Sequence, residues 1–168
     1  MKIILIGFMG CGKSSVTIAL SKLLKLPMLE MDELVYKKTH AKTMHEVFAK
    51  GGELLLRETE IEIAKEYIFA DNIVISTGAG IVMNKIILDY FKHRSAKIFF
   101  LNASFQVLKD RLTDDTSRPL FKDVIQARSL YDQRLPLYLM YADKVVDVER
   151  KSVTEIAQEI ALTLHGIS

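Results

Sequence analysis

The segment from Gly7 to Ser15 holds the residues whose types and spacing most clearly indicate chemistry. It has the pattern G-x-x-x-x-G-K-S/T of a phosphate-binding loop, and it follows the apolar run at residues 3–6. Glycines let backbone N–H groups surround a polyphosphate without Cβ clashes. The lysine of this pattern reaches the β- and γ-phosphates, and the hydroxyl after it can bind Mg²⁺. We therefore predict a nucleoside triphosphate site formed by Gly10, Cys11, Gly12, Lys13, Ser14 and Ser15.

Two acidic residues follow the next apolar run, Pro27–Met31, which we expect to be a strand. Glu30 and Asp32 are two residues apart, so on a strand they would share one face at the edge where ligands bind. We predict that one acid neutralises Mg²⁺, directly or through water, and that the other binds the hydroxyl to be phosphorylated. Plain surface charge is the alternative. Because the third expected strand, Asn72–Thr77, ends without a carboxylate, Ser14 would depend on this pair to complete the metal site.

Glycine and arginine residues supply further candidates. Gly78 and Gly80 follow the third strand and would let a small molecule approach backbone N–H groups, unless they only form a tight turn. A guanidinium suits bidentate binding of carboxylate or phosphate, although each arginine alone could be a surface charge. A polar segment at about residues 113–122 lies between two expected helices and is a candidate lid. The candidate arginines are Arg57, Arg111, Arg118 and Arg134.

The sequence pattern also predicts the strands and helices that must position these residues. The 168-residue chain alternates short apolar runs with helical patterns. The alternation predicts a single α/β domain over residues 1–168, with a parallel sheet covered by helices on both faces. The expected strands are Lys2–Ile6, Pro27–Met31, Asn72–Thr77, Ala96–Leu101 and Lys144–Asp147. The expected helices are Lys13–Lys25, Thr43–Ala49, Gly52–Phe69, Asn84–Lys92, Ser104–Leu112, Lys122–Tyr141 and Ser152–Leu164, the last with a capping box from Ser152 to Glu155.

The composition narrows the class of partners. A net charge of +2 with dispersed basic residues argues against nucleic-acid binding as the main role. No apolar run approaches the roughly 20 residues of a membrane span, and the early phosphate loop leaves no room for a signal peptide. The only cysteine, Cys11, excludes an internal disulfide and fits a reducing cytoplasm. We therefore expect a cytoplasmic monomer that binds small molecules and neither nucleic acid nor a membrane.

Together these features resemble the shikimate kinase family over essentially the whole chain. The resemblance rests on the loop at residues 7–15, the acid pair, and the sequences FAKGGELLLR (48–57), STGAG (76–80), RPL (118–120) and RLPLY (134–138). It implies an ATP- and Mg²⁺-dependent kinase that phosphorylates the 3-hydroxyl of shikimate, giving 3-phosphoshikimate and ADP in aromatic amino-acid biosynthesis. It also implies a three-layer P-loop kinase fold, with a parallel sheet in the order 2-3-1-4-5 and a closing lid.

The resemblance assigns roles to the matching positions on the acceptor side. Asp32 would bind the reacting hydroxyl of shikimate, and Gly80 would offer the substrate a backbone N–H group. Arg57 and Arg134 would clamp the shikimate carboxylate. The helices that bind this substrate would lie at about residues 32–60.

On the ATP side, the resemblance implies that Arg118 reaches the transferring phosphate from the lid and that Arg111 packs on adenine. The expected catalytic residues are Asp32, Lys13 and Arg118, and the expected metal ligands are Ser14 and Glu30.

Two positions depart from the family pattern. Glu30 stands where most members have aspartate, and Ala79 stands where the family usually has glycine. Because alanine resists positive φ, we predict a negative φ at Ala79.

Other functions share some of these features. Gluconate kinase is the alternative enzyme, because it would share the loop and the fold without needing Arg57 and Arg134. A nucleoside monophosphate kinase is less favoured, because no base-recognition segment of that family is evident. A catalytically silent nucleotide-binding module is disfavoured by the intact Lys13, Ser14 and Asp32, together with Arg118.

Overall fold

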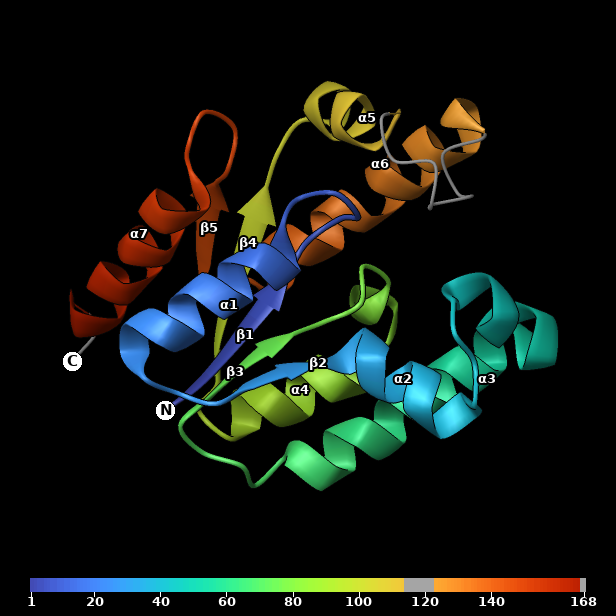
Figure 1. Cartoon of the computed structure of the whole chain (residues 1–168), viewed down its shortest axis with the longest axis horizontal. Helices are drawn as coiled ribbons and strands as arrows, with labels where there is room; N and C mark the ends of the chain where they lie inside the picture. The colour runs from blue at the N-terminus through green and yellow to red at the C-terminus, as the bar shows by residue number, and fades with distance from the viewer. Residues whose placement is uncertain (114–122, 167–168) are drawn as a thin grey trace.

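The computed structural model describes residues 1–113 and 123–166, and at its centre is a five-stranded sheet (Figure 1). The strands are β1 (Lys2–Ile6), β2 (Met28–Glu30), β3 (Ile73–Ser76), β4 (Lys97–Asn102) and β5 (Lys144–Asp147). Their order is β2-β3-β1-β4-β5, and every pairing is parallel. The predicted fold class and strand order are therefore confirmed.

Helices cover both faces of the sheet. One face is covered by α1 (Lys13–Leu24) and α7 (Val153–Gly166), and the other by α3 (Met44–Tyr67), α4 (Lys85–His93) and α6 (Val124–Tyr141) (Figure 1). All residues of β1 are buried, as expected for a central strand between two helical layers. The remaining helices, α2 (Met31–Thr39), η1 (Ile81–Met83) and α5 (Phe105–Thr113), follow β2, β3 and β4 at the C-terminal edge of the sheet.

Helix α2 departs from the prediction and changes how Asp32 is presented. The expected strand Pro27–Met31 ends at Glu30, and α2 begins at the next residue. Asp32 therefore lies in the first turn of a helix, and the prediction that it shares a strand face with Glu30 is wrong. Met31 and Val35 lie four residues apart and are both buried, which anchors the helix, and acidic residues stabilise its first turn.

The two helices expected at residues 43–49 and 52–69 are confirmed as two arms of α3, with a break between them. Gly52 has φ 66° and ψ −159°, a conformation essentially restricted to glycine. Thr43 caps the first arm, because its hydroxyl accepts a hydrogen bond from the Glu46 N–H at 3.2 Å. The break lets the second arm run back along the sheet toward β3.

Helix α7 begins with the capping box that the sequence predicts. Ser152 Oγ accepts from Glu155 N at 3.2 Å, and Glu155 Oε2 accepts from Ser152 N at 2.7 Å, so the capping box is confirmed.

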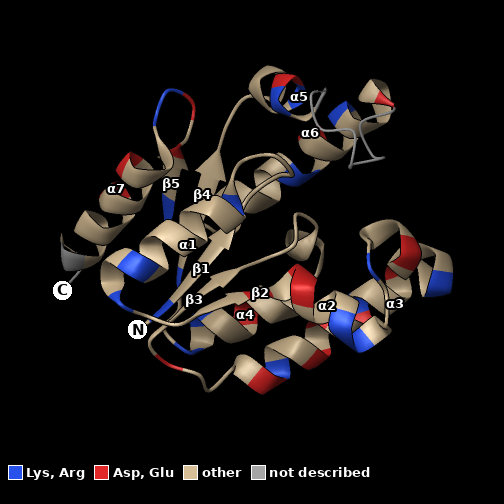
Figure 2. Ribbon diagram, in the orientation of Figure 1, with Lys and Arg blue, Asp and Glu red and all other residues tan. Residues whose placement is uncertain are grey.

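Lys and Arg are interspersed with Asp and Glu along α2 and α3 (Figure 2). Within residues 1–113 and 123–166, no helix has the length and apolar character needed to cross a membrane.

Candidate active site

The phosphate-binding loop joins the end of β1 to the start of α1, at the C-terminal edge of the sheet. Gly10 and Gly12 have φ of 80° and 92°, which L side chains rarely adopt. A Cβ on Gly10 would also lie 2.7 Å from Cδ1 of Leu112, so α5 packs directly against the loop. Gly12 is the N-terminal cap of α1, whose free N–H groups and positive dipole end form an arrangement that binds phosphate.

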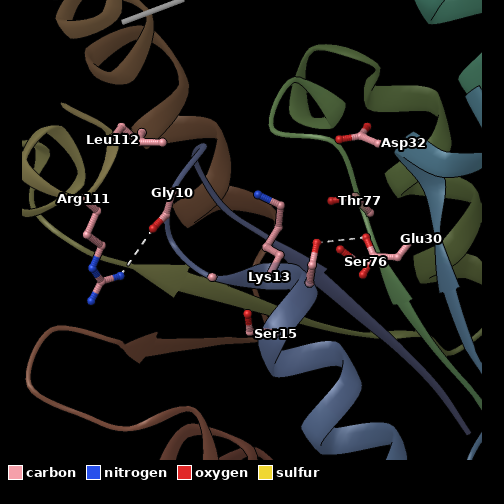
Figure 3. A pocket seen from close by; sticks show the side chains of 11 residues that line it. Gly10, Lys13, Ser15, Glu30, Asp32, Ser76, Thr77, Arg111 and Leu112 are labelled. Carbon is pink, nitrogen blue, oxygen red and sulfur yellow. Dashed lines mark hydrogen bonds between the residues drawn. The ribbon is translucent and has the colours of Figure 1, made fainter. Parts of the chain in front are cut away.

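Lys13 and Ser14 begin α1 and line a cavity of about 250 Å³ beside the loop (Figure 3). Lys13 Nζ donates to the carbonyl of Gly7 at 2.8 Å and to that of Phe8 at 3.2 Å, which holds the ammonium group over the loop. Ser14 Oγ donates to Glu30 Oε2 at 3.1 Å across the cavity. The two residues predicted as metal ligands therefore lie within hydrogen-bond distance of each other.

The other residues predicted for the ATP side divide into two groups. Gly10, Gly12 and Ser15 line the cavity with Lys13 and Ser14. Cys11 is only 2% exposed, and its Sγ lies 2.7 Å from where a Cβ on Gly7 would be. Its side chain is therefore packed under the loop, and only its backbone can contribute to a phosphate site.

Arg111 closes the far side of the cavity from the last turn of α5 (Figure 3). Its Nη1 donates to the Gly10 carbonyl at 3.4 Å, and its Nη2 donates to the Val148 carbonyl at 3.1 Å. These two hydrogen bonds hold the guanidinium between the phosphate loop and the segment that follows β5. Arg118 and the lid segment predicted at about residues 113–122 lie outside the described residues, apart from Thr113 at the end of α5.

Glu30 provides the test of whether this site suits Mg²⁺. Its Oε1 is buried and has no hydrogen-bond partner among residues 1–113 and 123–166. Burial raises the pKa of the Glu30 carboxyl, while nearby hydroxyls and Lys13 oppose that rise. Mg²⁺ prefers oxygen ligands and usually keeps waters and phosphate oxygens in its shell, so two protein groups are enough. Ser14 and Glu30 therefore fit this ion. The described part of the chain has no larger group, of three or more His, Cys, Asp or Glu residues, that could hold a metal.

Asp32 and Arg57 meet the loop that follows β3. A Cβ on Gly78 would lie 2.7 Å from Asp32 Oδ1, and one on Gly80 would lie 2.3 Å from Arg57 Nη2. Neither glycine could carry a side chain without displacing a predicted substrate-binding group. Ala79, between them, is not among the residues with positive φ, which confirms the prediction made for it.

Glu60 is a site residue that sequence reasoning missed. Its carboxylate accepts two hydrogen bonds from Arg57 Nη1, at 3.0 and 2.8 Å, and its side chain is only 2% exposed. Burial raises the pKa of Glu60, and the positive charge of Arg57 opposes that rise. Glu53 accepts from Arg57 Nη2 at 3.1 Å, so two acids fix the guanidinium. The signal was the spacing of these acids, four residues before and three after Arg57 on one helix face.

Arg134 reaches the site from α6. Its guanidinium carbon lies 6.0 Å from the centre of the Phe8 ring, beside the phosphate loop. Its Nε is buried and has no hydrogen-bond partner within the described part of the chain. A buried guanidinium N–H without an acceptor is costly, so this atom suits an anionic ligand.

Three comparisons with known proteins agree on one family. A family model described as shikimate kinase matches residues 9–165. The chain is 36% identical over 167 residues to a shikimate kinase of Aquifex aeolicus, which covers 99% of this chain and 97% of that protein. It is 38% identical over 162 residues to a shikimate kinase of Lactococcus lactis, which covers 95% of this chain and 96% of that protein. A solved structure of shikimate kinase from Acinetobacter baumannii in complex with shikimate has a TM-score of 0.91 at 27% identity, covering 99% of this chain and 94% of that one.

The comparisons also bear on the alternative enzyme. A gluconokinase from Sinorhizobium meliloti has a TM-score of 0.58 at 17% sequence identity. A likeness of that degree shows a shared fold alone. It gives no support to gluconate as the substrate of this chain.

Proposed function

This chain belongs to the shikimate kinase family, and on that premise we propose how its residues divide the work of the reaction. The reaction transfers the γ-phosphate of ATP to the 3-hydroxyl of shikimate, giving 3-phosphoshikimate and ADP in aromatic amino-acid biosynthesis. Phosphoryl transfer needs positioning and neutralisation of charge more than covalent chemistry by the protein. Each residue is therefore given a role according to the substrate that it binds and the charge that it neutralises.

Asp32 carries this proposal, because it belongs to both halves of the site. It lines the cavity beside the phosphate loop, and its Oδ1 also lies against Gly78 of the loop after β3. A carboxylate in that position can accept a hydrogen bond from the 3-hydroxyl of shikimate and take its proton as the phosphate arrives. Asp32 is therefore the group that aligns acceptor with donor.

On the acceptor side, Arg57 and Arg134 bind the carboxylate of shikimate, and the Gly80 N–H contacts the same molecule. The two acids that fix the Arg57 guanidinium support this role, because a preorganised fork loses little entropy on binding a carboxylate. The buried Nε of Arg134 supports its role as the second arm.

On the ATP side, Lys13 and the amides of the phosphate loop bind the β- and γ-phosphates. Arg111 packs against adenine, a role supported by its place in the lining of the cavity and by the two hydrogen bonds that fix its guanidinium. For Arg118, a contact with the transferring phosphate is proposed from the family resemblance alone.

Mg²⁺ would be held by Ser14 and by Glu30, the latter directly or through water. The ion would supply positive charge that neutralises the phosphates. The buried, unpartnered Oε1 of Glu30 supports this assignment. The longer side chain of glutamate keeps the carboxylate that most of the family provides as aspartate.

We also propose that the chain is a single domain over residues 1–168 and a cytoplasmic monomer. One continuous core among the described residues supports the single domain, and the free Cys11 thiol fits a reducing compartment. Light scattering coupled to gel filtration should give a mass near 19.1 kDa. Twice that mass would contradict the monomer.

Release of ADP in a coupled assay tests the proposal. With ATP and Mg²⁺ present, shikimate should support turnover, whereas gluconate and nucleoside monophosphates should leave only the background rate. Omitting Mg²⁺ should abolish turnover. Turnover with shikimate and no added divalent cation would contradict the metal assignment, and no turnover with shikimate would contradict the acceptor.

A further inference from the structure

Helix α6 carries two buried tyrosines, and each donates a hydrogen bond to the backbone of a different loop. Tyr138 donates to the carbonyl of Ala79, just after β3. Tyr131 donates at 2.9 Å to the carbonyl of Ala103, just after β4. Seven residues separate the two tyrosines, so they lie two turns apart on the same helix face. The helix is therefore fastened at the ligand edge of the sheet to two loops, which follow the strands on either side of β1.

Tyr138 is the more deeply buried of the pair and has little freedom to move. Its side chain is 0% exposed, and its ring stacks on that of Phe100 in β4, with centroids 4.9 Å apart and planes at 20°. Burial raises the pKa of the Tyr138 phenol, and the positive charge of Arg134 opposes that rise only in part. The hydroxyl therefore stays protonated at neutral pH and acts as a hydrogen-bond donor.

The segment that Tyr138 holds is also fastened at its other end. Asn84, at the end of η1, is buried and donates through Nδ2 to the Arg57 carbonyl at 3.1 Å. Between the two ties, Gly80 lies directly against the Arg57 guanidinium. Residues 78–84 thus form a bridge from α6 to α3.

This bridge connects the two helices from which Arg57 and Arg134 project. We infer that Tyr138 is a positioning residue for shikimate, which sets the Gly80 N–H and the separation of Arg57 from Arg134. The inference rests on the acceptor site proposed above. Without the hydroxyl, the Ala79 carbonyl loses its donor and the bridge is free to shift toward α3. A displacement of about 1 Å is enough to impair substrate alignment severely.

Replacing Tyr138 with phenylalanine tests this inference, because the stacked ring is kept and one hydroxyl is lost. We expect Tyr138→Phe to raise the KM for shikimate about tenfold and to change the KM for ATP by less than about twofold. Tyr131→Phe is the matched control on the same helix, since it also removes one hydroxyl bound to a backbone carbonyl. It should leave the KM for shikimate within about twofold of wild type.

The pair separates positioning from stability. Both variants lose a buried hydrogen bond, so both should melt at a lower temperature, and melting alone does not distinguish them. The inference is overturned if Tyr138→Phe keeps the wild-type KM for shikimate, if both KM values rise together, or if Tyr131→Phe raises the KM for shikimate equally. If Tyr138→Phe fails to fold, Asn84→Ala cuts the other tie and should give the same selective rise.

A third variant separates this inference from the proposed acceptor site. Arg134→Lys keeps the charge and loses the planar fork, so the KM for shikimate should rise if Arg134 binds the carboxylate. A rise with Arg134→Lys but none with Tyr138→Phe would reject the positioning role alone. An unchanged KM with Arg134→Lys would reject the carboxylate clamp, and with it the basis of the inference.

Discussion

The ATP side and the proposed shikimate side of the site are built in different ways. The phosphate-binding part of the ATP side comes from one continuous segment, residues 7–15, whose glycine conformations shape a backbone cradle, and Glu30 and Arg111 join it from β2 and α5. The shikimate side is assembled from α2, α3, the loop after β3, and α6. The first depends on local backbone conformation, whereas the second depends on packing between elements far apart in the sequence.

The two sides also hold their positively charged side chains differently. Lys13 lies against the neutral carbonyls of Gly7 and Phe8, so the charge of its ammonium group is available to phosphate. Arg57 is already paired with Glu53 and Glu60, so much of its charge is offset. The ATP side is therefore arranged to supply charge and the shikimate side to supply orientation. Changes on the first side should lower kcat, and changes on the second should raise the KM for shikimate.

The largest effect should come from removing charge on the ATP side. Lys13→Ala deletes the ammonium group over the loop and should lower kcat by about 10³-fold, because charge placed for the transition state contributes that much in other enzymes. The KM for shikimate should change little. Lys22→Ala, in the last turn of the same helix, is the control and should keep the wild-type kcat. Steady-state kinetics with both substrates varied would measure this, and a loss seen mainly in the KM for shikimate would contradict the contrast.

Asp32 belongs to both sides, so its substitution should give the next largest loss. Asp32→Asn keeps the shape and removes the charge, and kcat should fall by about 10²-fold, a usual contribution of general acid–base groups. Glu30→Asp restores the acid usual in the family and should keep most of the activity. The reverse ranking of these two variants would show that the metal-side acid, and not Asp32, limits the reaction.

The ATP side could be predicted from the sequence more completely than the shikimate side. The loop, the short strands and their parallel arrangement were predicted from the residues themselves, because short apolar runs and closely spaced glycines act locally, whereas the strand order was implied by the family resemblance. The residue pattern was interpreted as a strand ending at Met31 and not as α2, although Met31, Leu34 and Val35 have helical spacing; only the family resemblance implied helices at about residues 32–60. Asp32 was nevertheless identified, although the strand geometry used to place it was wrong.

Arg57 and Arg134 could be assigned together only by resemblance to a family. They lie on α3 and α6, and no periodicity in the chain indicates that these helices approach the same loop. Glu60 was missed for a related reason, because a glutamate three residues from an arginine on a helix is common at surfaces. Its burial under the acceptor loop depends on tertiary packing.

A smaller effect, confined to the shikimate side, should follow from Gly80→Ala. The new Cβ would lie 2.3 Å from Arg57 Nη2, so the guanidinium would have to shift from the position in which its two acids hold it. We expect the KM for shikimate to rise about tenfold, with kcat and the KM for ATP near wild type. Gly166→Ala is the control, because a Cβ there meets nothing within 4 Å. A fall in kcat without a rise in this KM would show that Gly80 acts on phosphoryl transfer.

The smallest effect should come from Ala79→Gly, which restores the residue usual in the family. Ala79 already adopts a negative φ, so the loop does not need glycine there. Glycine should lower the free energy of unfolding by about 0.5–1 kcal/mol, because the unfolded chain gains conformational freedom. The KM for shikimate should not change, since the carbonyl that Tyr138 binds is present in either residue. Urea denaturation and steady-state kinetics would measure the two quantities. A rise in KM as large as that of Gly80→Ala would mean that the Ala79 side chain, and not the contacts with α3 and α6, holds the loop, and the shikimate side would then depend on local backbone conformation as the ATP side does.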